Sequence, residues 1–69
     1  MTRDQLMAEA GQMDAQAAVN DAYRTAMERT NGRLGHLNNP MSYAAHGYAA
    51  ANKRRRAADL RAQAAGLAS

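Results

Sequence analysis

Four consecutive cationic side chains are the residues best suited to chemistry in this chain of 69 residues. They form the run Lys53-Arg54-Arg55-Arg56, and Arg61 follows one to two helical turns later. Four successive side chains on a helix point right round its axis, so they do not all face one partner. They can bind nucleic acid phosphates or an acidic patch on a protein, or their stems can cover alanines while the charged ends stay in water. We predict partner or phosphate binding by these residues, with the solvated interpretation left open.

Ser42 and His46 have the spacing of a nucleophile and its base, because residues four apart share one helical face. No acid lies close by in the sequence to orient the histidine, so we interpret both as capping or surface residues. His36 and His46 are too far apart in sequence to indicate a metal pair. The sequence therefore predicts no catalytic residue, metal site, cofactor or small-molecule substrate, and we expect a protein that is not an enzyme.

Three acids, Asp14, Asp21 and Glu28, recur every seven residues. Side chains with this spacing line one side of a helix, where carboxylates can form a ladder for a cation. A solvated helix face gives the same spacing far more often, and we favour that interpretation.

Two tyrosines and two methionines are predicted to form an interaction surface. Tyr43 and Tyr48 are expected on different faces of one helix, just before the basic run. Met13 and Met27 have flexible thioether side chains that suit adaptable binding surfaces, although methionine also fills irregular cores. In a chain without Ile and Phe, core filling is the stronger alternative.

Composition, together with residues typical of helix starts and stops, predicts the helices that carry these side chains. Strong helix formers dominate, and the β-branched and aromatic residues that favour strands are scarce, so the fold class is all-α. Thr2 and Gln5 match a capping box at the start of a helix over about 3–30. Asn31-Gly32 is a typical helix stop.

A second helix is predicted over about 40–65, with Asn39 as its cap, Pro40 at its first position and Gly66 as its stop. The connection between the helices is rich in Gly and Asn, and Leu34 and Leu37 leave room for one short helical turn within it. We therefore predict a helical hairpin that forms a single small domain over 1–69.

Apolar spacing and charge predict how the two helices pack. One apolar stripe of the first helix contains Leu6, Ala10, Met13 and Ala17, and a second, rotated stripe contains Val19, Tyr23, Ala26 and Met27. Two stripes indicate a helix that either has two neighbours or wraps around one. Residues 1–32 carry a net charge of −2 and residues 33–69 carry +5, so antiparallel packing would let the first helix partly neutralise the second.

The expected setting follows from what the sequence lacks. There is no cysteine for the disulfides that small extracellular folds use. No apolar stretch is long enough to span a membrane, and the acidic residue Asp4 near the start argues against a signal peptide. We expect an intracellular, cytoplasmic protein or one inside a virion, not a secreted or membrane protein.

The apolar inventory is small for a domain of this length: no Phe, Trp, Ile or Cys, and 5 Met. Such a chain gains stability by packing against itself or a partner. Its basic, alanine-rich, cysteine-free composition resembles that of small accessory proteins of phage particles, such as minor head, scaffold or internal proteins. We predict a structural component of a larger assembly or homo-oligomer. The alternatives are a basic nucleic-acid-binding accessory protein and a small inhibitor or regulator that docks on a host enzyme.

Overall fold

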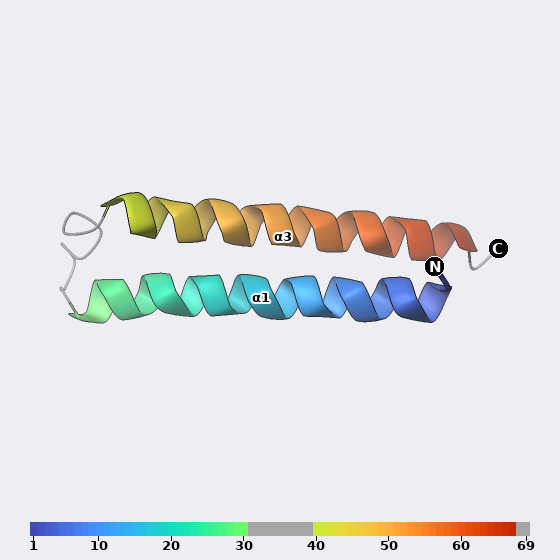
Figure 1. Cartoon of the computed structure of the whole chain (residues 1–69), viewed down its shortest axis with the longest axis horizontal. Coiled ribbons are helices and arrows are strands. Elements are labelled where there is room, and N and C mark those ends of the chain that lie inside the picture. Colours follow the sequence, from blue (N-terminus) through green and yellow to red (C-terminus); the bar gives the residue numbers. More distant parts are fainter. Residues whose placement is uncertain (31–39, 68–69) are drawn as a thin grey trace.

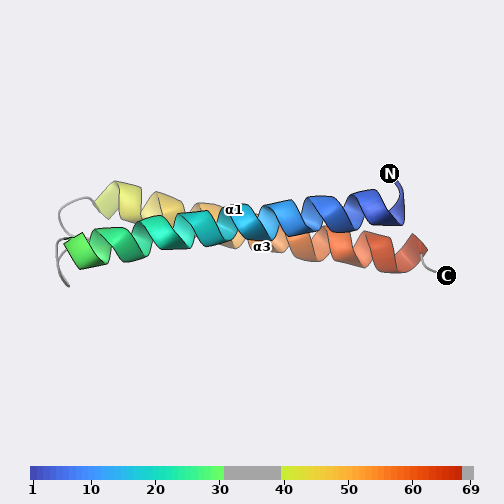
Figure 2. The same ribbon diagram turned by 90° about the horizontal axis from the view of Figure 1, so that it is seen from below.

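The chain folds into two long helices that lie side by side and antiparallel (Figures 1 and 2). The structure is a computed structural model that describes residues 1–30 and 40–67, with every side chain among them except those of Thr30 and Pro40. Helix α1 spans Arg3–Thr30 and helix α3 spans Pro40–Leu67. They form a rod of 49 × 14 × 14 Å with both termini at one end. The described residues contain no strand, so the predicted all-α hairpin is confirmed.

The start of α1 is fixed by the capping box that the sequence predicts. The backbone N–H of Gln5 donates to Oγ1 of Thr2 at 3.1 Å, and the N–H of Thr2 donates to Oε1 of Gln5 at 2.8 Å. The two bonds satisfy amides that have no partner inside the helix. Helix α1 therefore begins and ends where it was predicted.

Helix α3 begins at Pro40 as predicted but continues through Gly66 to Leu67, two residues beyond the expected end. Gly66 does not take the left-handed backbone conformation that would stop a helix. The two extra residues place Leu67 in the lining of a surface hollow that Leu6 also lines. The predictions made for the connection, namely the Asn31-Gly32 stop, the turn at Leu34 and Leu37 and the Asn39 cap, lie outside the described residues.

Both helices contribute a stripe with alternating spacings of three and four residues, which is the heptad pattern of a coiled coil. We call the two stripes together the seam. On α1 it consists of Leu6, Ala10, Met13, Ala17, Asn20, Arg24 and Met27. On α3 it consists of Tyr43, His46, Ala50, Lys53, Ala57, Leu60, Ala64 and Leu67. Every seam residue except Leu67 is buried or half-buried, and the helices cross at a shallow angle, as coiled-coil packing requires (Figure 2).

Alanine and leucine build the core near the termini. One buried cluster joins Leu6 and Ala10 to Ala57, Leu60 and Ala64, and Met13 packs against it. Among the described residues Leu60 is the one large side chain that is fully buried. The stability that this core can supply is correspondingly small.

Most of the expected second stripe of α1 is not covered by α3. Val19 and Tyr23 are 54% and 56% exposed, and Ala26 is also exposed. The seam continues instead through Asn20, which is only 8% exposed, and on to the half-buried Met27. Within the described chain α1 thus has one neighbour. Val19 and Ala26 face outward, and Tyr23 lies at the edge of the seam, where its ring stacks on His46 of α3.

Candidate interaction surfaces

The acids that recur on α1 meet arginines of α3 in a cross-helix ladder. Asp14 accepts from Nη2 of Arg61 at 2.5 Å, and Asp21 pairs with Arg54 in the same way. The acids are seven residues apart and so are the arginines, so antiparallel packing brings both pairs into register. The hydrogen bond from Arg54 lowers the pKa of Asp21 below its ordinary value, and the same bond raises the pKa of Arg54. The predicted neutralisation of one helix by the other is confirmed at these two pairs.

This ladder divides the predicted basic cluster. Arg54 and Arg61 are bound to α1 carboxylates, and Lys53 is half-buried in the seam. Arg55 donates from Nη1 to Oδ1 of Asn52 at 3.5 Å, and Arg56 is exposed. Neither of these last two pairs with a carboxylate among the described residues. The structure therefore leaves two of the predicted phosphate-binding cations open to an outside partner.

At the next heptad position of the ladder, α3 carries Gly47 in place of a cation. The guanidinium of Arg24 fills the space: a Cβ on Gly47 would lie 3.2 Å from Cζ of Arg24. The same guanidinium carbon lies 4.2 Å from the ring centroid of Tyr43, which is a cation–π contact. Tyr43 donates its hydroxyl proton to Oε1 of Glu28, and this bond raises the pKa of Tyr43. Because position 47 has no side chain, the guanidinium of Arg24 can lie against α3 there.

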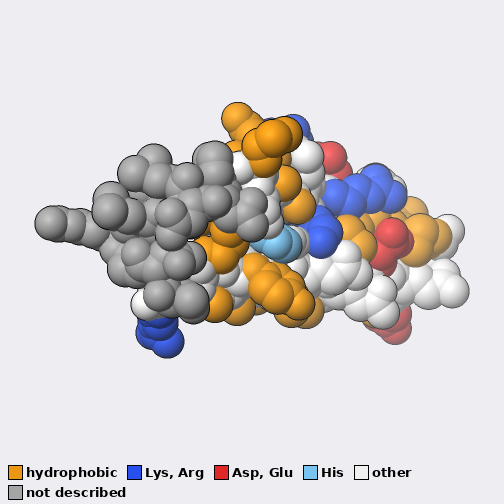
Figure 3. Space-filling view, turned by 60° about the vertical axis from the view of Figure 1, so that its left-hand side comes forward, with side chains coloured by type: hydrophobic (Ala, Val, Ile, Leu, Met, Phe, Trp, Pro, Cys, Tyr) orange, Lys and Arg blue, Asp and Glu red, His pale blue; other side chains and the backbone are white. Residues whose placement is uncertain are grey.

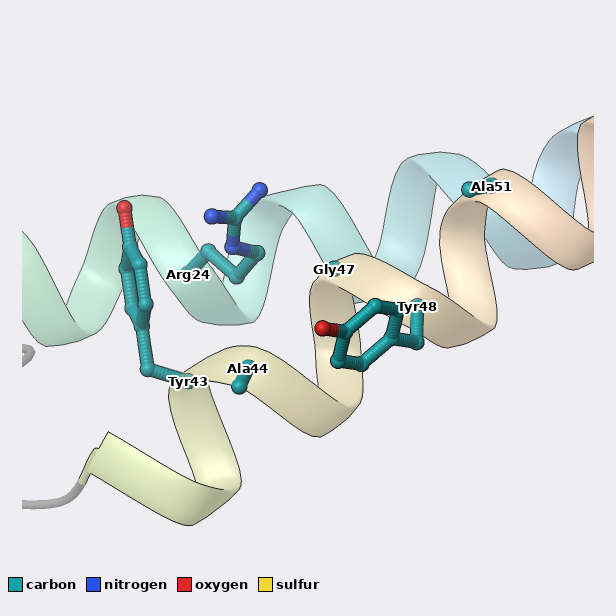
Figure 4. A pocket seen from close by; sticks show the side chains of 6 residues that line it. All are labelled: Arg24, Tyr43, Ala44, Gly47, Tyr48 and Ala51. Atoms are coloured by element: carbon teal, nitrogen blue, oxygen red, sulfur yellow. The ribbon is translucent and has the colours of Figure 1, made fainter.

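Tyr43 and Tyr48 line the same hollow, although the sequence places them on different helical faces. The hollow has a volume of about 460 Å³ and is open to solvent, and Figure 4 shows Arg24 of α1 reaching over it between the two rings. The remaining lining comes from Ala44, Gly47 and Ala51. Nε of Arg24 is buried without a hydrogen-bond partner. Arg24 therefore contacts the ring of Tyr43 and shares the lining of the hollow with Tyr48.

His46 is held by α1 and not by Ser42. Nδ2 of Asn20 donates to the backbone oxygen of Gln16 at 3.0 Å, which leaves Oδ1 of Asn20 as an acceptor 2.8 Å from Nδ1 of His46. Because an amide oxygen can only accept, Nδ1 of His46 donates this hydrogen bond. The ring also stacks on Tyr23 with centroids 5.0 Å apart. These contacts give the half-buried histidine a packing role between the helices, whereas the sequence interpretation expected a capping or surface residue.

The outward side of α1 forms a surface that the sequence interpretation recognised only in part. Its exposed apolar positions, which we call the outer face of α1, are Ala8, Gly11, Ala15, Ala18, Val19, Ala22 and Ala26. Val19, Ala22, Tyr23 and Ala26 line a shallow hollow of about 270 Å³ on it. The signal that would have found this face is the lack of charge on that side of the helix between Asp4 and Arg29. Hydrophobic side chains also form much of the surface in Figure 3, on either side of the histidine.

The two methionines predicted for an interaction surface lie at the seam. Met13 packs against the buried cluster, and Met27 is half-buried opposite α3. Met1, Met7 and Met41 are the more exposed methionines, at 70%, 42% and 84%. Met13 and Met27 thus contribute to holding the hairpin together.

Comparison with known proteins adds no further assignment: no protein-family model, curated protein or solved structure matches this chain. Neither described helix is both long and apolar enough to cross a membrane. Residues 1–30 and 40–67 contain no group of three side chains suited to holding a metal ion.

Proposed function

We propose that this protein is a non-enzymatic structural component, a helical hairpin that is built into a larger protein assembly through the outer face of α1. The observation that carries the proposal is the uncharged outer face itself. A solvated helix normally presents charged and polar residues on the side away from its core. Here Asp14, Asp21 and Glu28 lie beside the seam with α3, and between Asp4 and Arg29 the side toward water carries mainly alanine, glycine and valine. Contiguous apolar surface of this kind is typical of a protein-binding site.

The small core supports the same proposal. Leu60 is the one large side chain fully buried in the described residues, and alanines fill most of the rest. Burying a second apolar face against a partner would add hydrophobic stabilisation in proportion to the area covered. A hairpin of this kind gains much of its stability from binding.

The finer identity that we propose is a minor virion or scaffold-type protein of a phage, with a cytoplasmic or virion-interior location. It rests on the composition: 46% apolar residues that are mostly alanine, no cysteine and a net charge of +3. The engagement of His46 by Asn20 and Tyr23 supports a role without catalysis.

Site-specific photo-crosslinking tests the proposal. The full chain carries p-benzoylphenylalanine at Ala22 on the outer face of α1, or at Ala62 on α3 as a matched exposed alanine. Each version is irradiated in the cells or particles that naturally contain it. We expect Ala22 to give adducts of discrete mass and Ala62 to give few. Irradiation that leaves the Ala22 version entirely uncoupled would rule out an assembly role for this face.

A second candidate is a nucleic-acid-binding accessory protein, which is favoured by the exposed pair Arg55 and Arg56. Replacing both by alanine should weaken duplex binding equally for all sequences and reduce the log–log salt slope by about two, one for each phosphate contact. Replacing Arg54 and Arg61, which are bound to α1 carboxylates, is the matched control and should change the slope less. An unchanged slope for Arg55→Ala with Arg56→Ala would exclude this candidate.

A further inference from the structure

Building on the proposed assembly role, we infer that the outer face of α1 binds the same face of a second copy of this chain, with the two α1 helices antiparallel. A second heptad stripe runs along this side of α1 and joins residues of the outer face to polar residues near the two ends of the helix. It consists of Asp4, Ala8, Gly11, Ala15, Ala18, Ala22, Thr25 and Arg29. The spacings alternate between four and three throughout, and all eight residues are exposed. The stripe spans about 38 Å at 1.5 Å per residue, nearly the length of the helix.

The spacings between the stripe residues are the same whether they are counted from the first residue or from the last. They are symmetric about the midpoint between Ala15 and Ala18, so rotating one copy by 180° superimposes the pattern on itself. In that arrangement Ala15 of one copy faces Ala18 of the other, and Gly11 faces Ala22. A self-complementary surface of this kind is what a twofold dimer requires.

Charge selects the antiparallel orientation. The stripe has one acid, Asp4, at its start and one cation, Arg29, at its end. Antiparallel pairing brings each Asp4 beside the Arg29 of the other copy, at both ends of the contact. Parallel pairing would bring like charges together at each end, which is unfavourable.

The hairpin itself removes the charge that would oppose this contact. Asp14 and Asp21 flank the stripe, so four carboxylates would approach one another across the twofold axis. Arg61 and Arg54 of the same hairpin pair with these acids. The two copies therefore pair as folded hairpins, because the ion pairs within each hairpin neutralise these acids.

Residue size permits a close contact. Alanine and glycine at the central positions let two helix axes approach more closely than leucine would allow. A Cβ built on Gly11 meets nothing within 4 Å, so the face is open there. Val19 stands beside the twofold axis at 54% exposure and would be covered. The outward side of α3 fits less well, because Arg55 and Asp59 interrupt its alanines.

Sedimentation equilibrium of the full chain tests the inference. We expect a species of twice the 7.4 kDa chain mass. Ala18→Glu, which places like charges near the twofold axis, should weaken the dimer by more than about tenfold. Ala58→Glu puts the same change at an exposed alanine of α3 and should leave the dimer intact. A chain that stays monomeric at all concentrations, or a dimer lost with Ala58→Glu and retained with Ala18→Glu, would overturn the inference.

Disulfide mapping tests the orientation, because the chain has no cysteine of its own. When a Gly11→Cys chain is mixed with an Ala22→Cys chain, the antiparallel register predicts the mixed disulfide between them. Ala22→Cys alone should not couple, since its two copies would lie about 16 Å apart along the axis. Rapid coupling of Ala22→Cys with itself would contradict the antiparallel register.

Charge reversal supplies a second test of orientation. Asp4→Arg alone and Arg29→Asp alone should each weaken the dimer by about two- to fivefold, and the double reversal should restore it. Failure of the double reversal to restore affinity would contradict the proposed end contacts.

The photo-crosslinking experiment separates this inference from the proposed function. An Ala22 adduct of twice the chain mass supports both. Adducts with other proteins only would overturn the second copy as the occupant and leave the assembly role supported. Uncoupled chains would overturn both.

Discussion

The two halves of the hairpin use one geometry with different chemistry. In the terminal half, the end with both termini, the seam is apolar and consists mainly of Leu6, Ala10, Ala57, Leu60 and Ala64. In the loop half, the seam is polar and its main side chains are Asn20, Arg24, Tyr43 and His46. The terminal half is held by burial of apolar area, and the loop half by directional contacts.

This difference indicates a division between stability and register. Alanines at successive heptads are alike, so an alanine-rich seam tolerates a slip of one heptad with little change in packing. The bond between Asn20 and His46 and the contact between Arg24 and Tyr43 each exist in one register alone. We infer that the terminal half supplies most of the cohesion and the loop half fixes the alignment.

The largest effect is expected at Leu60. Leu60→Ala removes the one large side chain that is fully buried in the described residues and should cost about 2–5 kcal/mol of unfolding free energy. Leu67→Ala, at a seam position that is 57% exposed, is the matched control and should cost under about 1 kcal/mol. Thermal and urea melts followed by circular dichroism measure both. Equal losses would mean that the terminal half is not the main source of stability.

A smaller effect is expected in the loop half. Asn20→Ala leaves Nδ1 of His46 without its partner, which costs about 1–3 kcal/mol, and the higher helix propensity of alanine offsets part of that loss. Replacing both residues by leucine removes both polar groups and should raise the melting temperature above that of the natural chain. Asn52→Ala, at an exposed position, is the control.

The register prediction concerns the same pair of leucine substitutions. If the loop half fixes the alignment, the doubly substituted hairpin should gain stability but populate more than one alignment of the two helices. Broadened amide resonances in its two-dimensional NMR spectrum would report the loss. A spectrum as sharp as that of the natural chain would show that the polar contacts are not needed for the alignment.

The two halves also differ in how far the sequence predicts them. Helix limits follow from local signals, such as the reciprocal Thr2 and Gln5 bonds, so α1 was placed correctly. The terminal half of the seam follows from apolar spacing. In the loop half the seam continues through Asn20 and Arg24, while apolar spacing points to Val19 and Tyr23, so apolar spacing alone does not predict this part of the packing.

The candidate surfaces could be recognised only once the alignment of α3 with α1 was known. Residue types identify Asp14, Asp21 and the arginines as charged groups, but their pairing depends on how α3 aligns with α1. The heptad repeat of the acids is visible in the sequence, and an equal repeat of Arg54 and Arg61 is the matching signal. Gly47 could not be recognised as space for Arg24, because that role depends on a residue more than 20 positions away.

The smallest effect is expected from the exposed ladder, and it depends on pH. Hydrogen bonding to Arg54 lowers the pKa of folded Asp21 below that of the unfolded chain. The stabilisation is therefore complete above the unfolded pKa, near 4, and is lost as the pH falls through the lower folded pKa. Asp21→Asn should lower the melting temperature at neutral pH, and its difference from the natural chain should shrink as the pH falls below the unfolded pKa of the carboxyl toward the lower folded pKa. Asp59→Asn, at an exposed position outside the ladder, should not show this dependence on pH.

Salt gives a second test of the same ion pair. Because exposed ion pairs are screened, about 1 M salt at neutral pH should narrow the difference in melting temperature between Asp21→Asn and the natural chain. A gap that persists in acid would assign the effect of Asp21 to packing and not to its charge.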